Sequence, residues 1–158
     1  MSEAATASQV HHVPITGTWT YRSYLNNPAL VGGDANKALA LIFGEGVYTL
    51  AQHREHEITG VLDMGGGYAL DVTGERRHAP DPAAFLLYLI GKGRAGTPTA
   101  GWQYNYQLLP DPMWREGVNQ VPTLVGTTLR AVPHNGEPAG VTASVIMVWA
   151  PPTPAPAT

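Results

Sequence analysis

The feature that most constrains the fold is a pair of alternating segments on either side of three glycines, Gly65-Gly66-Gly67. If Met64 faces Tyr68 across this turn, the large apolar side chains share one face, namely Ile58, Leu62, Met64, Tyr68, Leu70 and Val72. The opposite face then carries Thr59, Val61, Asp63, Asp71 and Thr73. A slip of one residue would mix the two sets, because successive strand residues point to opposite faces. The pattern therefore predicts an antiparallel hairpin with one face on a core and the other in water.

Similar short segments follow one another along the chain, separated by turns that draw on 18 glycines and 14 prolines. We expect a loop with a helical turn at 26–37, and a bulge where Gly44 and Gly46 flank Glu45. Residues 83–90 could instead form a helix begun by Asp81-Pro82, but we favour a strand because the neighbouring segments are strands. The strands are predicted at 15–24, 38–53, 56–64, 68–75, 85–92, 102–108, 123–132 and 141–149.

The fold class predicted from these segments is all-β, an eight-stranded antiparallel up-and-down β-barrel formed by residues 13–150 as one domain. Residues 1–12, which are small and polar, and the Pro-rich residues 151–158 are expected to be disordered. A hydrophobic content of 44% with only 13% charged residues excludes a chain that is disordered throughout.

Composition also excludes several classes of function. The net charge of −3 and a total of 9 lysines and arginines do not suit a nucleic-acid binder. With no cysteine, the chain has no disulfide, no thiolate nucleophile and no cysteine-based zinc site. We find no signal peptide and no apolar run near the roughly 20 residues of a membrane span. We therefore expect a soluble, cytoplasmic protein without membrane or nucleic-acid partners.

Three short motifs resemble those of calycin barrels, the lipocalin and streptavidin kind. Ile15-Thr16-Gly17-Thr18-Trp19 carries the Gly-x-Trp that opens their first strand, Ile58-Thr59-Gly60 resembles a third-strand motif, and Gly101-Trp102 resembles a later one. The resemblance implies a calycin-like barrel in which Trp19 closes one end. Tyr21 stands where the biotin-binding members place an asparagine, so the resemblance does not extend to biotin. Small barrel cyclases share this architecture, which leaves binder and enzyme both open.

Aromatic side chains are expected to line the barrel interior. Trp102, Tyr104 and Tyr106 alternate with polar residues, and Trp19, Tyr21 and Ser23 share one face of the first strand. Such rows either fill a core or form a flat-walled pocket for an aromatic molecule, since small barrels do either. Long loops at a barrel mouth supply polar contacts, which adds Trp114 and Asn119 from the 110–120 loop. The candidate ligand-binding residues are Tyr21, Ser23, Trp102, Tyr104, Tyr106, Trp114, Asn119 and Arg130.

Arg130 shares a strand face with Leu124, Gly126 and Thr128. We expect this face to lie outside, where Arg130 is an ordinary surface residue. On the inside it would be a buried cation that needs a carboxylate or an anionic ligand.

Other polar clusters are interpreted as structural. His53 and His56 have opposite parity on a strand, so no metal site is predicted, and no cofactor is expected. Asp63 and Asp71 are diagonal neighbours in the hairpin and could act as an acid–base pair. Their place opposite Leu62 and Leu70 instead predicts a solvent-facing position.

The predicted function is the binding of a small apolar or aromatic molecule inside the barrel. The alternatives are a small barrel enzyme (a cyclase, isomerase or hydrolase) with Tyr, Arg or His at the mouth, and a structural protein with a filled interior. Apolar side chains lie on both faces of 85–92 and of 141–149. A soluble monomer rarely leaves such an outer face bare, which predicts a homodimer or homotetramer.

Overall fold

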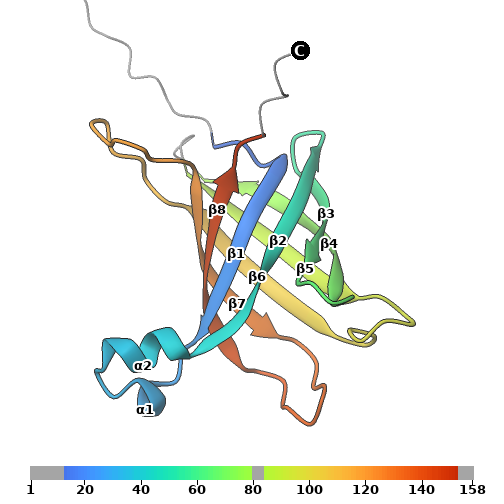
Figure 1. The fold of residues 1–158 in the computed structure, drawn as a ribbon. Coiled ribbons are helices and arrows are strands. Elements are labelled where there is room, and N and C mark those ends of the chain that lie inside the picture. Colours follow the sequence, from blue (N-terminus) through green and yellow to red (C-terminus); the bar gives the residue numbers. More distant parts are fainter. Residues whose placement is uncertain (1–12, 80–83, 153–158) are drawn as a thin grey trace, which may run out of the picture.

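The computed structural model describes residues 13–79 and 84–152, so the expectations for residues 1–12 and 153–158 lie outside the described residues. The described chain forms a closed barrel of eight strands, each antiparallel to the next, in which the last pairs with the first (Figure 1). The strands are β1 (Gly17–Leu25), β2 (Ile42–His53), β3 (Glu57–Asp63), β4 (Ala69–His78), β5 (Phe85–Gly93), β6 (Gln103–Pro110), β7 (Thr123–Arg130) and β8 (Thr142–Ala150). The predicted up-and-down barrel is confirmed, and residues 85–93 form a strand.

The hairpin of β3 and β4 has the predicted register. Leu62 pairs with Leu70, and the backbone N–H of Met64 donates to the Tyr68 carbonyl at 2.9 Å. Leu62 and Leu70 are buried, and Met64 is half-buried against the core. Tyr68 is 43% exposed, so the expectation that it lies inside is wrong. It lies beyond the last pair of the ladder, at the rim, where its ring is 5.9 Å from that of Trp102.

The segment between β1 and β2 is more helical than predicted. It contains α1 (Pro28–Val31) and α2 (Ala35–Ala40), so the expected start of β2 at residue 38 is wrong. The Asp34 carboxylate accepts hydrogen bonds from the backbone N–H groups of Asn36 and Lys37, which caps the first turn of α2. The irregularity in β2 falls at Phe43, because Ser23 pairs with Gly44 while Tyr24 pairs with Ile42. It therefore lies beside the glycine pair that predicts a bulge.

The two ends of the barrel carry different connections. At the Trp19 end lie residues 54–56 and 111–122, together with the first and last described residues (Figure 1). At the Arg130 end lie residues 26–41, 64–68, 94–102 and 131–141. Consecutive connections alternate between the ends, because every strand reverses the direction of the one before it.

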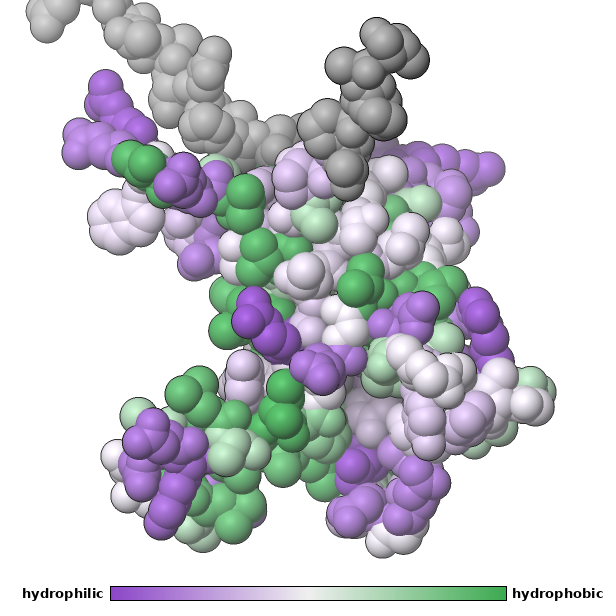
Figure 2. Space-filling view, in the orientation of Figure 1, coloured by the Kyte–Doolittle hydropathy of each residue, from purple (hydrophilic) through white to green (hydrophobic). Residues whose placement is uncertain are grey.

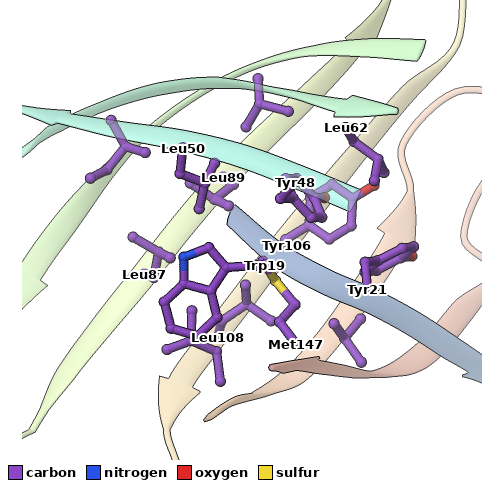
Figure 3. Packing of buried hydrophobic residues seen from close by; sticks show 14 of the residues in the cluster. Trp19, Tyr21, Tyr48, Leu50, Leu62, Leu87, Leu89, Tyr106, Leu108 and Met147 are labelled. Carbon is purple, nitrogen blue, oxygen red and sulfur yellow. The ribbon is translucent and has the colours of Figure 1, made fainter. Parts of the chain in front are cut away.

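The interior is packed from the Trp19 end to its middle (Figure 3). Trp19 is fully buried, and its indole N–H donates to the Ile15 carbonyl at 2.9 Å. Leucines and Met147 surround it, and three tyrosines lie next along the axis. The Tyr21 and Tyr106 rings each pack edge-to-face with Tyr48, at 5.4 and 5.8 Å between centroids. Side chains thus fill this part of the barrel, as they do in many eight-stranded barrels.

Apolar residues also remain on the outer surface. Ile146 on β8 is 41% exposed and pairs with Val125 on β7, which pairs with the exposed Leu109 on β6. On β5 the outward Tyr88 is half-buried. β5 and β8 are not neighbours in the barrel, so these apolar faces are separate. Within the described chain, neither short helix approaches the length and apolar character that a membrane crossing requires.

Candidate functional site

Arg130 lies inside the barrel, at the opposite end from Trp19. Its side chain is on the inner face of β7 with Leu124 and Thr128, and the residue is only 6% exposed. The expectation that this face points to solvent is wrong. Both faces of β7 carry apolar residues, so alternation within the strand does not select one, and closure of the barrel turns the Leu124 face inward. The structure therefore has the buried cation that the alternative interpretation described.

The guanidinium of Arg130 has few partners for a buried charge. Its Nε–H donates to the Tyr104 hydroxyl at 3.3 Å, and Nη1–H donates to the Pro138 carbonyl at 3.1 Å. The guanidinium also lies 5.3 Å from the centre of the Phe43 ring. The nearest carboxylate oxygen, on Glu137, is 3.8 Å away, and that side chain is 65% exposed. An ion pair at this distance with a mostly solvated carboxylate contributes little, so the positive charge is incompletely balanced.

The Tyr104 hydroxyl connects Arg130 to an aromatic stack at the mouth of the barrel. It shares a hydrogen bond of 2.7 Å with Nε2 of His134, from the connection between β7 and β8. The His134 ring stacks on Trp102, with centroids 4.1 Å apart and planes 14° from parallel. The mouth therefore already holds one planar ring against Trp102, supplied by the chain itself.

Local sequence explains where His134 lies. Asn135 and Gly136 both have positive φ, 52° and 76°, and His134 forms a β-bridge with Glu137 across them. This is the Asn-Gly geometry of a tight two-residue hairpin. The turn folds the connection back so that His134 and Glu137 lie side by side, both within reach of Arg130.

The surroundings of His134 favour its neutral form. Burial lowers the pKa of His134, the charge of Arg130 lowers it further, and Glu137 acts in the opposite direction. Its Nδ1 is buried and has no hydrogen-bond partner among the described residues. The mouth thus combines a positive charge with a neutral ring that has an unused polar atom.

Deeper in the barrel the polar groups are hydroxyls. Tyr21 donates to Ser23 at 2.8 Å, and Ser23 donates to the Gly44 carbonyl at 3.4 Å. The hydroxyls of Tyr48 and Thr128 are buried and have no partner among the described residues. Burial raises the pKa of Tyr21 to about 12, and it raises that of Tyr48 well above the usual value. These tyrosines stay protonated at neutral pH.

Most of the predicted site residues lie inside the barrel between its middle and the Arg130 end. They are Tyr21, Ser23, Trp102, Tyr104, Tyr106 and Arg130, all on inner faces or at the mouth of the Arg130 end. Trp114 and Asn119 are not part of this group. They lie in the 111–122 connection at the Trp19 end, where Trp114 is 81% exposed. This separation follows from strand order, because the connections after β5 and after β6 must lie at opposite ends.

Two residues of the site were absent from the sequence-based candidates. Phe43 reaches the interior at the irregularity in β2 and lies 6.0 Å from the Tyr104 ring. His134 could have been found from the Asn-Gly pair that follows it, since this pair predicts a tight turn. The sequence signal for Phe43 was weaker, because the shift in the register between β1 and β2 falls one residue before the Gly44–Gly46 segment.

The remaining polar clusters lie outside this site. His53 and the exposed His56 face different groups, since Nε2 of His53 contacts the Thr59 hydroxyl while Nδ1 of His56 contacts the Arg76 carbonyl. Asp71 is exposed, and its Oδ1 accepts hydrogen bonds from both Nε and Nη2 of Arg94, which lowers the pKa of Asp71. A carboxyl with a lowered pKa is a poor general acid, which argues against the paired-carboxylate interpretation. Within residues 13–79 and 84–152, no cluster of histidine and carboxylate groups is arranged to hold a metal ion.

None of the protein-family models, curated proteins or solved structures compared with this chain matches it. What the site can do follows from its own chemistry. It offers aromatic surface for stacking, one guanidinium, and hydroxyl and imidazole groups in hydrogen-bonding reach of one another.

Proposed function

We propose that the protein binds a small apolar or aromatic molecule at the Arg130 end of the barrel interior. The observation that carries this proposal is the stack of His134 on Trp102, at 4.1 Å and 14°. A planar ring therefore fits against Trp102, and it is held there by a connection outside the strands. A ligand ring would take this position after His134 moves aside. Binding sites of this kind combine aromatic walls with a few polar groups that fix orientation.

The packed half of the barrel restricts where a ligand would lie. Trp19 and the three central tyrosines fill the rest of the interior, whereas Phe43, Trp102 and His134 at the Arg130 end are only partly buried. In Figure 2 the α1–α2 segment and the 131–141 connection form separate lobes at this end, with a notch between them. We therefore place the ligand at the mouth, with Tyr21 and Ser23 lying behind it.

Titration with a neutral fluorescent probe, N-phenyl-1-naphthylamine, tests this proposal. The wild-type protein should bind the probe saturably, and Trp102→Ala should weaken binding by roughly tenfold, the effect of losing one stacking partner. Trp114→Ala is the matched control, because Trp114 is exposed at the other end. Equal binding by all three proteins, or no binding at all, would refute the proposal. Native mass spectrometry of protein purified without denaturation would then identify a natural ligand.

A second function, a small barrel enzyme, is favoured by one specific observation. The Tyr104 hydroxyl contacts both the Arg130 guanidinium and the His134 imidazole, at 3.3 and 2.7 Å. A hydroxyl between a cation and a base can transfer a proton to or from a bound molecule. In the same mass-spectrometry experiment, Tyr104→Phe would retain a compound of different mass from the one in wild type. Identical ligands in both proteins would count against catalysis.

A further inference from the structure

We propose that the molecule bound at this mouth carries an anionic group, which Arg130 receives. This inference rests on the proposed function, since it specifies the ligand of the same site. The observation behind it is a charged side chain that is more than nine-tenths buried yet largely unpaired. Burying a charge is unfavourable unless hydrogen bonds or an opposite charge compensate for it.

The hydrogen bonds of Arg130 leave donors unused. A guanidinium has five N–H donors. Among the described residues, only Nε and Nη1 donate hydrogen bonds, to a tyrosine hydroxyl and to a carbonyl. Nη2 donates to none of them. Nη2 and the second hydrogen of Nη1 are thus available to an oxygen anion, which a guanidinium binds in a bidentate manner.

The one nearby carboxylate does not occupy this position. Glu137 is 3.8 Å from Nη1, longer than a hydrogen bond, and its side chain is mostly in solvent. Glu137 lies two residues after Asn135, in the same tight turn as His134. A ligand anion that binds Arg130 would replace a weak ion pair with a shielded, hydrogen-bonded one.

Further groups suit a ligand that is both aromatic and anionic. The Trp102 ring, 6.4 Å from the Tyr104 ring, provides the stacking surface, and the Tyr104 hydroxyl lies between that surface and Arg130. A planar ring on Trp102 would therefore have its anionic substituent directed along Tyr104 toward the guanidinium. The site fits aromatic carboxylates and sulfonates better than neutral aromatics.

Two probes that differ in charge test the inference. 1-Anilinonaphthalene-8-sulfonate has the ring system of N-phenyl-1-naphthylamine plus a sulfonate. The wild-type protein should bind the sulfonate at least about tenfold more tightly than the neutral probe, the effect of one charged hydrogen bond. Arg130→Gln should abolish this preference while leaving the neutral probe's affinity within about threefold. Arg22→Gln, at an exposed position on the outer face of β1, is the matched control and should change neither.

The outcomes separate the two proposals. If both probes bind equally to wild type, or if Arg130→Gln weakens them by the same factor, the inference is wrong and the aromatic site remains. If neither probe binds, both proposals fail. Should Arg130→Gln not fold, as judged by circular dichroism, the salt dependence in wild type decides. The preference for the sulfonate must then decrease as sodium chloride is added, because chloride competes for the guanidinium even where bulk salt screens a shielded pair little, and a preference that salt does not change would overturn the inference.

Discussion

Replacing Trp19 by alanine tests the packing of the closed half of the barrel. Trp19 is fully buried, and its strand is hydrogen-bonded on both sides, where Trp19 pairs with Tyr48 and with Trp149. Because both neighbouring strands are held in register, the surroundings cannot collapse far into the space that the indole leaves. The cost of deleting a large core aromatic is then about 3–5 kcal/mol. The Ile15 carbonyl also loses its indole donor, which places Trp19→Ala in the upper part of this range.

Urea unfolding measures this free-energy difference. With a slope of about 2 kcal/mol per molar, the midpoint should fall by roughly 2 M. Trp19→Phe keeps most of the volume but not the hydrogen bond, so a loss of about 1–2 kcal/mol is expected. Trp114→Ala removes an indole that is 81% exposed and should change stability by less than about 0.5 kcal/mol. A loss under about 1 kcal/mol for Trp19→Ala would refute the assignment of Trp19 as the plug of this end.

Three further predictions concern ionisation and assembly. Burial raises the pKa of Tyr106, like that of Tyr48, well above its usual value. Stability should therefore fall as the pH rises above about 10, because the unfolded chain releases these protons first, and urea unfolding at a pH of about 11 should raise the tyrosinate absorbance. No rise would show that the interior tyrosines are already ionised. Burial and Arg130 lower the pKa of His134, and the other groups facing it are Glu137 and Tyr104. Because the unfolded chain then binds the proton more readily, wild type should lose stability relative to His134→Gln as the pH falls from about 7.5 to about 5.5, and a constant difference would contradict this. Finally, we expect a homodimer or homotetramer formed through the outer faces of β5 and β8, which light scattering would detect and Ile146→Asp or Tyr88→Asp would disrupt; a monomeric mass would contradict it.

Much of the strand pattern can be predicted from the sequence because alternation is a local property. Apart from the start of β2, the strand ends agree with the predicted ones within three residues. Leu62 and Leu70 are buried as predicted, since each lies on a face whose other members are apolar, and Trp19 is buried as its place in the Gly-x-Trp motif implies. The sequence also predicts the inward face of β6 with Tyr104 and Tyr106, which Trp102 extends just before the strand, because polar residues alternate with them. Where one face is polar, only one orientation keeps the apolar side chains out of water.

The start of β2 shows a limit of this reasoning. Residues 38–40 are apolar enough to extend a strand, but Asp34 caps a helix across the same residues. The capping hydrogen bonds of one side chain outweigh a pattern that is compatible with either structure. Where a helix signal and a strand signal overlap over a few residues, the contacts that each structure makes therefore decide which one forms.

The sequence by itself determined the number and order of the strands, and with them which connections share an end of the barrel. Whether Arg130 points inward was decided only by tertiary structure, because both faces of β7 carry apolar and polar residues and closure of the whole sheet selects one. The candidate site has the same origin. His134 stacks on Trp102, which precedes it by a whole hairpin, and Phe43 reaches the same mouth from β2. Alternation along a strand specifies a face but not its neighbours across the barrel, and this site consists of side chains that meet across it.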